Sequence, residues 1–386
     1  MVLLPWRWVK SVSICPRLGP SRCPPRSMSR LWRGIAQLLL GVVLLLVLAV
    51  VTAFTAGPLE EWFLQPVLLS SHGQKGLAVG GEGDAPFDWV GQRSRDSIYR
   101  LTNPGVCAGE APFLVGLVVS KPAHWDSRQA IRESWGSVQE VRGRTVRTLF
   151  ALGSPSSPQE QELIDREAGT YRDVVQGRFR DSYLNLTLKT LMVLSWFTSY
   201  CPRSQFLLKV DDDVFLNYYR LVELLLDRGL ELGLGQDLYL GRVHRNVRAI
   251  RDHSSLYYVP ESVFPADTYP DYCSGTSYIL SASAARKVYR AALSLPLLPI
   301  EDVFVGLSAQ RAGVPPTHSS RMSGSLQFHF RPCCYQTIIT SHHIDAQELR
   351  NIWAQVNGSQ PCSAIARVSA LFICNLLNLR ELLRAS

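Results

Sequence analysis

Acidic residues are absent from the beginning of the chain, where no aspartate or glutamate precedes Glu60. The same stretch carries seven basic residues: Arg7, Lys10, Arg17, Arg22, Arg26, Arg30 and Arg33. The formal net charge of +8 comes largely from them, because removing seven from 40 basic residues leaves 33 against 32 acidic ones. The rest of the chain is nearly neutral, so we expect no basic recognition surface and no nucleic-acid partner.

Charged side chains are also absent from Ile35 to Ala56, a mostly aliphatic run of 22 residues. At about 1.5 Å per residue, such a helix spans a hydrocarbon core of ~30 Å. Basic residues before the run, with Glu60 and Glu61 after it, predict that residues 1–34 are cytosolic and the bulk of the chain is lumenal. The alternative is a cleaved signal peptide, whose apolar region is usually only ~7–15 residues long. We therefore predict an uncleaved signal-anchor over residues 35–56.

The cysteines lack the spacing of a zinc site. Seven of them follow the apolar run, where a lumenal location allows disulfides: Cys107, Cys201, Cys273, Cys333, Cys334, Cys362 and Cys374. Because seven is odd, at least one thiol is free or pairs between chains. Two N-glycosylation sequons, beginning at Asn185 and Asn357, agree with the secretory pathway.

The chain beyond the apolar run divides into three parts. Residues 57–111 are rich in Gly, Ser, Asp and Pro without a sustained period, which predicts a stem. Residues 112–362 alternate apolar runs with helical segments, which predicts a single α/β domain with a doubly wound sheet flanked by helices. Residues 363–386 are apolar enough to pack as a helix but too short and too charged for a second membrane span, and their role stays open.

Three consecutive carboxylates, Asp211, Asp212 and Asp213, follow the apolar run from Phe206 to Val210, which predicts a buried strand. Ligands of open α/β sheets bind at the carboxyl ends of strands. Adjacent carboxylates repel one another unless a cation or hydrogen-bond donors lie among them. Along a continued strand, Asp211 and Asp213 face one side and Asp212 the other. A solvated acidic turn is the alternative to the hypothesis that we favour, a Mn²⁺ or Mg²⁺ site that also holds substrate phosphate.

Arg128 and Arg132 lie four residues apart near the start of a predicted helix and therefore share one of its faces. Two guanidinium groups at the positive end of a helix dipole could bind a nucleotide diphosphate. The alternative is a surface helix whose arginines pair with Glu133 or Glu140. On these residues alone, the alternative is the better interpretation.

Glu301 and Asp302 stand between a proline break and an apolar helix start, where capping is the commoner role of such a pair. One carboxylate held in an apolar crevice could instead act as a general base. His342 and His343 follow an apolar run, and histidines in that position are more often structural than metal ligands. A cation held by the acidic triplet still needs another protein ligand, and imidazole suits Mn²⁺.

These residues belong to an ordered set of motifs. The set comprises Arg128-x-x-Ile-Arg-x-x-Trp135, Asp181-Ser-Tyr-x-Asn-Leu-Thr-x-Lys-Thr190, Leu208-Lys-x-Asp-Asp-Asp213, Tyr269-Pro-x-Tyr-x-x-Gly275, Glu301-Asp-Val-x-x-Gly306, Ile339-Thr-x-His342 and Ile352-Trp353. In this order, from about Pro112 to Cys362, the set resembles the β-1,3-galactosyltransferase family (glycosyltransferase family 31) and its β-1,3-N-acetylglucosaminyltransferase and Fringe relatives. Each motif is weak alone, whereas the ordered set is highly specific. The resemblance implies a GT-A fold, with a mixed and mainly parallel sheet in a single lumenal catalytic domain.

The resemblance also implies an activity. It is the inverting transfer of a sugar from a UDP-sugar by a type II Golgi membrane protein, with Mn²⁺, or Mg²⁺ in its place, as cofactor. Asp213 is similar to the metal-binding last Asp of the family motif, and His342 to the histidine that completes the metal site. Asp302 is similar to the catalytic base, which deprotonates the acceptor 3-hydroxyl for in-line attack on the anomeric carbon.

A further group of residues resembles the family's donor-binding positions. Asp211 and Asp212 are similar to the neighbours that contact the nucleotide-sugar. Arg128, Arg132 and Lys189 are similar to positions near the nucleotide. The resemblance therefore implies that these five residues bind the donor.

Two positions depart from the family pattern: Asp271 stands where Pro is more common, and Thr276 where Gly is. Both fall in a loop region expected to shape the sugar pockets, so the donor stays open between UDP-galactose, which we favour, and UDP-N-acetylglucosamine. The expected acceptor is a glycan on a glycoprotein, glycolipid or proteoglycan at the Golgi membrane. A non-catalytic lumenal glycan-binding protein is disfavoured by the intact Asp302 and His342. A metal-dependent phosphohydrolase is disfavoured because the sequence lacks a second acidic cluster.

Overall fold

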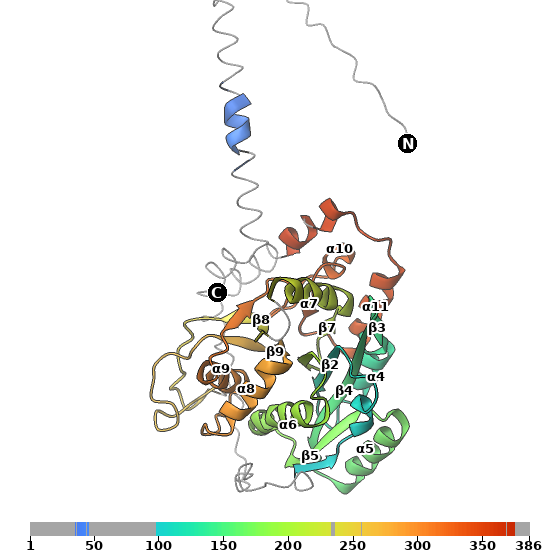
Figure 1. Ribbon diagram of the computed structural model, residues 1–386, viewed down its shortest axis with the longest axis vertical. Coiled ribbons are helices and arrows are strands. Elements are labelled where there is room, and N and C mark those ends of the chain that lie inside the picture. The colour runs from blue at the N-terminus through green and yellow to red at the C-terminus, as the bar shows by residue number, and fades with distance from the viewer. Residues whose placement is uncertain are drawn as a thin grey trace, which may run out of the picture. The chain divides into compact units, whose positions relative to one another are not determined.

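The strands of the structure follow the apolar runs of the sequence, and helices occupy most of the segments between them (Figure 1). This computed structural model describes residues 35, 37–43, 45, 98–232, 236–255, 257–367 and 369–374. The chain forms two compact units, Met1–Val51 and Thr52–Ser386.

In the first unit, the described residues 35, 37–43 and 45 are helical. None of the helices in the described part of the chain is long and apolar enough to cross a bilayer. The tail of residues 1–34 and most of the predicted signal-anchor, residues 35–56, lie outside the described residues. The membrane topology therefore stays a prediction.

The second unit contains, within its described residues, a mixed sheet of nine strands. Their order is β1 (Tyr99–Leu101), β5 (Val174–Arg180), β4 (Arg144–Ser154), β2 (Leu114–Val119), β6 (Phe206–Asp211), β9 (Tyr272–Ser281), β8 (Tyr239–His244) and β10 (Pro316–His318), with β3 (Glu140–Val141) paired to β4. Strands β5, β4, β2 and β6 run parallel, β9 is antiparallel to both of its neighbours, and β10 is parallel to β8. The mainly parallel sheet that the sequence predicts is confirmed.

Strand β2 lies at the centre of the parallel part and is buried at all six of its positions. This burial explains its continuous apolar sequence, because both faces of the strand are covered. Val119 at the end of β2 is in register with Asp211 at the end of β6. The register therefore brings Ser120, which follows β2, next to the acidic triplet.

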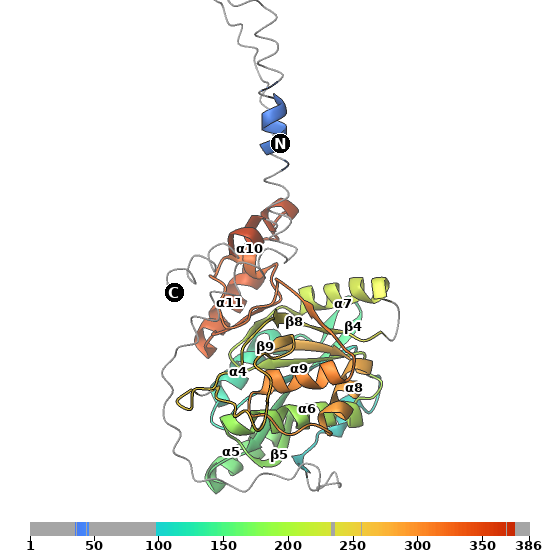
Figure 2. The ribbon, with the colours of Figure 1, turned by 90° about the vertical axis from the view of Figure 1, so that its left-hand side faces the viewer.

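Helices cover both faces of the sheet (Figures 1 and 2). One face carries α6 (Leu186–Tyr200), α8 (Ala282–Ala292) and α9 (Glu301–Arg311), and the other α4 (Trp125–Glu133), α7 (Tyr218–Leu232), α10 (Pro332–Tyr335) and α11 (Ala346–Gly358). Helix α5 (Pro158–Tyr171) packs through Ile164 against β4 and β5. Short 3₁₀ helices are η1 (Pro104–Cys107), η2 (Trp135–Ser137) and η3 (Tyr183–Asn185). Helix α6 is buried from Thr187 to Phe197, so it shows no polar face to water.

Three disulfides crosslink the described part of this unit. They join Cys107 to Cys201, Cys333 to Cys362, and Cys334 to Cys374. Cys273 is the one free cysteine among the described residues, and it is buried. The odd thiol expected from the cysteine count is therefore confirmed in this part of the chain.

The ordered domain extends beyond both of the boundaries predicted from the sequence. Strand β1 and Cys107 lie in the segment predicted as stem, ahead of Pro112, and the rest of that segment up to residue 97 is outside the described residues. After Cys362, residues 364–367 and 369–374 are helical, with Leu371 and Cys374 buried. The tail packs as a helix because two disulfides hold it on α10.

Candidate active site

The acidic triplet lies at the carboxyl edge of the sheet, where several strands end. Strand β6 ends at Asp211, β2 ends just before Ser120, and β5 ends just before Asp181. Strand β9 runs the other way, so its beginning, and with it Gly275, reaches the same edge. Polar groups from distant segments therefore meet at the position where open α/β sheets bind ligands.

Each carboxylate of the triplet has partners of its own. Asp211 accepts a hydrogen bond of 2.7 Å from Lys209 Nζ. Asp212 accepts one of 2.7 Å from Ser120 Oγ and lies 2.9 Å from His124 Nδ1. Desolvation raises the pKa of Asp211 to about 6 and outweighs the opposing effect of Lys209. A solvated acidic turn does not describe this arrangement, because Lys209 is buried and the side chain of Asp212 is only 11% exposed.

Asp213 faces a different segment of the chain. It precedes the short strand β7 (Phe215–Leu216), which pairs with β11 (Thr340–Ser341), and His342 follows β11 directly. The pairing brings His342 Nε2 to 3.2 Å from Asp213 Oδ2. Although desolvation opposes it, the hydrogen bond with His342 lowers the pKa of Asp213, which keeps this carboxylate ionised.

Asp213, His342 and His343 can supply ligand atoms that all lie within 4.8 Å of one another. The two imidazole rings stack with their centroids 3.9 Å apart, and His343 has a φ of 59°. His342 Nδ1 has no hydrogen-bond partner among the described residues, so the contact between Nε2 and Asp213 orients the ring. A carboxylate with two imidazoles fits a transition ion such as Mn²⁺. The structure thus adds His343 to the pair that the sequence predicted.

Glu301 and Asp302 begin α9 on the other side of Lys209. Glu301 is buried and accepts hydrogen bonds from Thr190 Oγ1 at 2.8 Å and Tyr278 Oη at 2.9 Å. Asp302 accepts hydrogen bonds from the backbone N–H groups of Gly275 at 3.2 Å and Val303 at 2.9 Å. Desolvation raises the pKa of Asp302 to about 7, and neighbouring Glu301 adds to the rise. A carboxyl group in this range changes protonation near neutral pH, as a general base requires.

Lys209 connects the two halves of the site. The side chain is 1% exposed and lies 2.7 Å from Asp211 Oδ1 and 3.6 Å from Glu301 Oε2. It also donates a hydrogen bond to the carbonyl of Gly275. Although burial lowers it, the net pKa of Lys209 is raised, because Asp211 and Glu301 favour the ammonium form. Sequence reasoning missed this role, although a lysine inside the apolar run from Phe206 to Val210 was a signal for it.

The predicted donor-binding cations are engaged with carboxylates of the domain itself. Lys189 is buried and lies 2.8 Å from Asp181 Oδ2, and its Nζ donates a hydrogen bond of 2.6 Å to the Ser120 carbonyl. Arg128 is 1% exposed and donates to Glu167 from Nε at 2.8 Å and from an NH2 group at 2.6 Å. Arg128 and Lys189 therefore both form hydrogen bonds with the loop that follows β2, and these bonds position the loop.

Arg132 lies beside Arg128 on α4, as the four-residue spacing predicts. It donates hydrogen bonds to Glu167 and to Asp173, whose carboxylate it meets with two nitrogens at 2.8 and 2.9 Å. The predicted surface pairing with Glu133 or Glu140 is wrong: Glu133 accepts a hydrogen bond from Arg350 instead, and Glu140 lies on β3. A direct donor contact by these arginines stays a prediction.

The two sequons lie in different surroundings. The side-chain amide of Asn185 donates to the Arg180 carbonyl at 2.9 Å, while Thr187 is buried and donates to the Leu298 carbonyl at 2.6 Å. Asn357 is exposed near the end of α11. Glycosylation at either residue stays a prediction.

Comparison of the sequence with known proteins identifies a family. A family described as galactosyltransferase matches residues 126–320. Beta-1,3-galactosyltransferase 4 of Mus musculus is 41% identical over 285 residues, which cover 67% of this chain and 76% of that protein. The chain belongs to the galactosyltransferase family.

Two further relatives show the range of this family. Beta-1,3-galactosyltransferase 9 of Homo sapiens is 38% identical over 279 residues, covering 72% of this chain and 75% of that protein. Lactosylceramide 1,3-N-acetyl-beta-D-glucosaminyltransferase of Homo sapiens is 38% identical over 263 residues, covering 66% of this chain and 68% of that protein. This galactosyltransferase-family protein is therefore a hexosyltransferase, as the motif set predicts.

A solved structure, the apo form of the bifunctional glycosyltransferase WbbM, aligns with 55% of this chain and 39% of its own. Its TM-score is 0.31 and its sequence identity is 11%.

The ion pairs of Arg128 predict a specific stability effect in this galactosyltransferase-family protein. Glu167→Ala leaves the buried guanidinium group of Arg128 without its carboxylate, while the partly buried Arg132 keeps Asp173, and we expect a loss of about 3–5 kcal/mol of unfolding free energy. Glu162→Ala on the same helix removes a carboxylate that is 73% exposed, and we expect a change below about 1 kcal/mol. Denaturant unfolding followed by tryptophan fluorescence measures both. Equal effects of the two substitutions would contradict the structural role assigned to Arg128.

Proposed function

We propose that this protein is an inverting β-1,3-galactosyltransferase that moves galactose from UDP-galactose to the 3-hydroxyl of an acceptor glycan. The observation that carries the proposal is that Lys209 lies between two kinds of acidic group, one suited to hold a cation and one suited to act as a base. On one side, Asp213, His342 and His343 offer ligands for a cation. On the other, the Asp302 carboxylate accepts hydrogen bonds only from backbone N–H groups within the described part of the chain, and its pKa is raised to about 7.

The residues of the metal side would hold the cation that neutralises the diphosphate of the donor. Mn²⁺, when bound by Asp213 and the two histidines, supplies positive charge to the diphosphate as the bond to the sugar breaks. Asp211 and Asp212 stand between this side and the base, and their positions suit hydrogen bonding to the ribose or the sugar. Ser120 and His124 fix the orientation of Asp212. Mg²⁺ is the alternative cation, although the imidazole ligands favour Mn²⁺.

Asp302 acts on the acceptor. In its ionised form it takes the proton from the acceptor 3-hydroxyl, whose oxygen then bonds to the anomeric carbon. The electron pair of the broken glycosyl–phosphate bond leaves with UDP. A single displacement inverts the anomeric configuration and needs only one base, whereas a two-carboxylate glycosidase uses a second carboxyl group as an acid. Glu301 is engaged with Thr190, Tyr278 and Lys209 and is not available for that second role.

A β-1,3-N-acetylglucosaminyltransferase is the second candidate, because a relative that is 38% identical carries that name. The two departures from the family pattern lie close to the site. Thr276 Oγ1 donates to the Ser323 carbonyl at 3.0 Å, and Asp271 lies 3.5 Å from Arg245. Both side chains thereby attach the start of β9 to neighbouring loops, and the choice of donor depends on the space that these loops leave. A phosphohydrolase remains disfavoured, because the described residues contain one candidate cluster of metal ligands and a two-metal site requires more.

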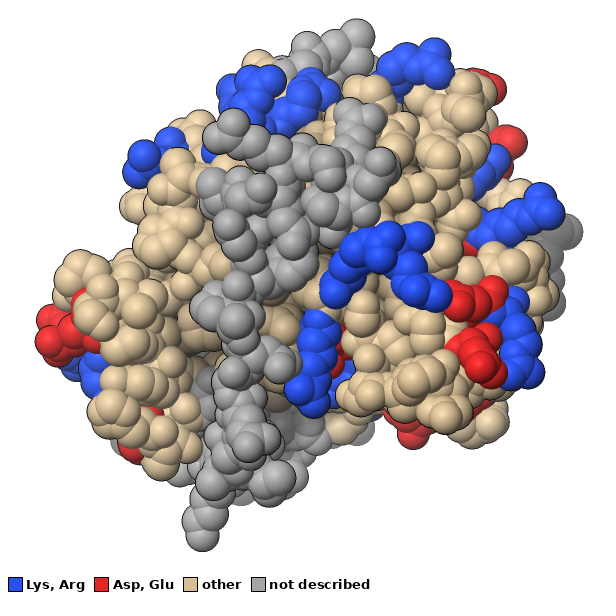
Figure 3. Space-filling model, turned by 90° about the horizontal axis from the view of Figure 1, so that it is seen from below, with Lys and Arg blue, Asp and Glu red and all other residues tan. Residues whose placement is uncertain are grey.

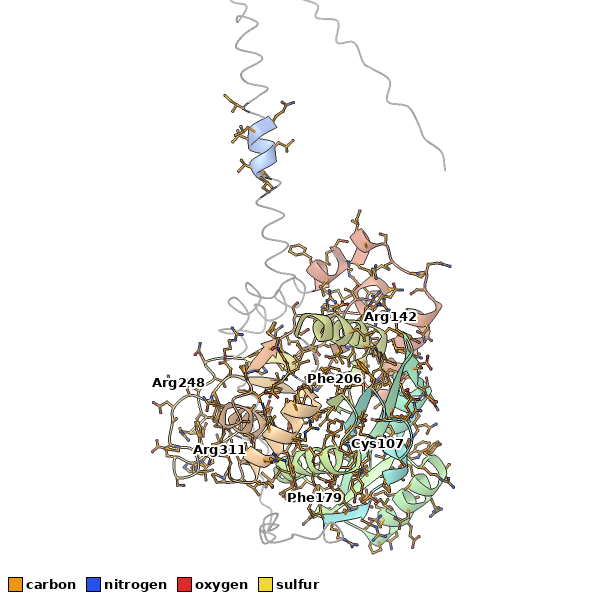
Figure 4. The ribbon with its side chains drawn as sticks, viewed as in Figure 1. Cys107, Arg142, Phe179, Phe206, Arg248 and Arg311 are labelled. Carbon is orange, nitrogen blue, oxygen red and sulfur yellow. A yellow bond between two sulfur atoms is a disulfide. The ribbon has the colours of Figure 1, made fainter. Side chains whose placement is uncertain are left out.

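We further propose a GT-A fold and a type II arrangement in the Golgi membrane, with residues 1–34 cytosolic and 57–386 lumenal. The three disulfides of the second unit support an oxidising compartment. Basic side chains occupy separate places on the face shown in Figure 3, and Arg142, Arg248 and Arg311 are labelled at separate places in Figure 4. This scatter argues against a nucleic acid as the partner. The acceptor that we propose is a glycan on a glycoprotein, glycolipid or proteoglycan.

The proposed reaction predicts acceptor-dependent release of UDP by the full-length chain in detergent. A panel of UDP-sugars and simple glycosides, with Mn²⁺ or with EDTA, identifies the donor. We expect the highest rate with UDP-galactose, loss of the rate in EDTA, and a decrease of about 10²–10⁴-fold in Asp302→Asn. Asp165→Asn, on exposed α5, is the matched control and keeps the wild-type rate. Full activity of Asp302→Asn would exclude this residue as the base, and a preference for UDP-N-acetylglucosamine would favour the second candidate.

The raised pKa of Asp302 predicts the pH dependence of the reaction. The base must be ionised, so kcat/KM should rise with pH and level off above the pKa of about 7. A bound cation lowers this inflection, because positive charge favours the carboxylate. The measurement is the initial transfer rate from pH 5 to 9 at low substrate concentration. An acidic limb of the same shape in the residual activity of Asp302→Asn would assign the limb to another group.

A further inference from the structure

Two disulfides hold the last described segment of the chain against the short helix α10. Cys333 and Cys334 are adjacent in α10, and they are bonded to Cys362 and Cys374 respectively. The second of these bonds is fully buried at both of its cysteines, and it fixes the helical residues 369–374. The donor binding and the proton transfer described above make no use of this crosslinked segment.

Tyr335, the last residue of α10, contacts both of the short strands that carry the candidate metal ligands. Its buried ring packs edge-on against Phe215 of β7, with the ring centroids 4.9 Å apart. Its Oη lies 3.0 Å from Oγ of Ser341 in β11. Phe215 follows Asp213 by two residues, and Ser341 directly precedes His342. One side chain therefore bridges the strand that follows the carboxylate and the strand that precedes the imidazole.

The backbone of α10 supports the same two strands from their far ends. The carbonyl of Tyr335 accepts a hydrogen bond of 3.0 Å from Asn217 Nδ2, and Asn217 directly follows β7. The backbone N–H of Asn217 in turn donates to the carbonyl of Ile339, just before β11, at 2.8 Å. Within the turn after α10, the N–H of Ile338 donates to the Cys334 carbonyl at 2.9 Å. The disulfide-bonded residues of α10 are thus connected by hydrogen bonds to both strands.

The strand pair needs this support because it is very short. Strands β7 and β11 have two residues each, and a small two-stranded sheet is not stable by itself in water. The Ser341 hydroxyl accepts a hydrogen bond of 2.9 Å from the N–H of Phe328, whose carbonyl accepts one of 2.7 Å from Tyr335 Oη. The distance of 3.2 Å between His342 Nε2 and Asp213 Oδ2 therefore depends on contacts that Tyr335 makes.

Building on the cation site of the proposed function, we propose that Tyr335 is a positioning residue for Asp213 and His342, and that the segment after Cys362 holds it in place through the two disulfides. Tyr335 does not touch the cation. It keeps β7 and β11 paired, so that the carboxylate and the imidazole stand ready before the ion arrives. The apolar residues after Cys362 thereby acquire a function, which is to preorganise the metal ligands.

The alternative is that the two disulfides only stabilise the domain, and the third disulfide provides the comparison. The bond between Cys107 and Cys201 joins residues 94 apart, whereas the two bonds of α10 join residues 29 and 40 apart. A disulfide that closes a longer loop restricts the unfolded chain more, so its removal should destabilise the domain at least as much. Cys107 and Cys201 belong to the other hydrophobic cluster, which contains none of the residues of β7, β11 or α10. Removing this bond should therefore leave the metal ligands in place.

The affinity for Mn²⁺ distinguishes positioning from general stability. Paired substitutions in the full-length chain remove one disulfide at a time without leaving a thiol: Cys333→Ala with Cys362→Ala, Cys334→Ala with Cys374→Ala, and Cys107→Ala with Cys201→Ala. Electron paramagnetic resonance with UDP present gives the Kd of Mn²⁺, and denaturant unfolding gives the stability of each variant. We expect the Kd to rise about 10-fold in the first two pairs. In the third pair it should stay within about twofold, although the unfolding midpoint decreases.

Tyr335→Phe tests the positioning residue itself, because it removes the hydroxyl and keeps the ring. The loss of its hydrogen bonds should raise the Kd of Mn²⁺ about 3- to 10-fold, and Tyr335→Ala should raise it further. Tyr99→Phe is the matched control, since Tyr99 is also buried and also donates to a backbone carbonyl, that of Met192, in the other hydrophobic cluster. We expect no change in its Kd.

Hydrogen exchange of the metal-free chain gives a second measurement that does not depend on a bound ion. Mass spectrometry follows the peptides that cover residues 213–217 and 339–344. Their amides should exchange at least about 3-fold faster in Tyr335→Phe and in both disulfide variants of α10, and at the wild-type rate in the two controls.

The outcomes separate this inference from the proposed function. Wild-type Mn²⁺ affinity in both disulfide variants of α10 and in Tyr335→Ala would overturn the positioning role and leave the cation site intact. An equal loss of affinity in the variant without the bond between Cys107 and Cys201 would also overturn it, because general destabilisation would then explain the effect. Absence of Mn²⁺ binding in the wild type, with exchange that still depends on Tyr335, would contradict the cation of the proposed function while confirming that Tyr335 holds the two strands together.

Discussion

The ammonium group of Lys209, buried between Asp211 and Glu301, is the interaction on which the rest of the site depends. A buried lysine is costly unless anions surround it, and two carboxylates in the same interior are costly without a cation. The ammonium group and the two carboxylates therefore offset one another's cost of burial. Because β6 supplies Lys209 and Asp211, and α9 supplies Glu301, the same contact sets the distance between the acidic triplet and the base.

This arrangement assigns cation binding and proton transfer to different carboxylates. Asp213 turns away from Lys209 towards His342, where ionisation is favoured and a cation can be held. Burial and the charge of Glu301 outweigh the support that the Asp302 carboxylate receives from two backbone N–H groups and Lys209, so Asp302 can still take a proton near neutral pH. Behind this edge, the pairing of Arg128 with Glu167 holds the loop after β2 in place. Arg128 thus positions the loop beside the site, and its direct contact with a donor stays a prediction.

How far the sequence predicted this structure depends on the range of each interaction. The apolar runs predicted β2 and β6, and the residues after β6 predicted the site, since those signals are local. The ion pairs of Arg132 with Asp173 and of Lys189 with Asp181 could not be predicted, because they join segments whose proximity depends on the strand order. The predicted start of the domain at Pro112 was wrong for a similar reason. Strand β1 has three residues and is stabilised by pairing with β5, which leaves no periodic pattern in its own sequence.

The central claim, that Asp213 and the histidines hold a cation while Asp302 stays outside its coordination, is tested most directly by Mn²⁺ binding. Electron paramagnetic resonance of the full-length chain, titrated with Mn²⁺ in the presence of UDP, gives the affinity and the number of bound ions. The account predicts one site per chain, weakened at least about 10-fold in Asp213→Asn and in His342→Ala, and unchanged in Asp302→Asn. Equal Mn²⁺ affinity in wild type and Asp213→Asn would contradict it.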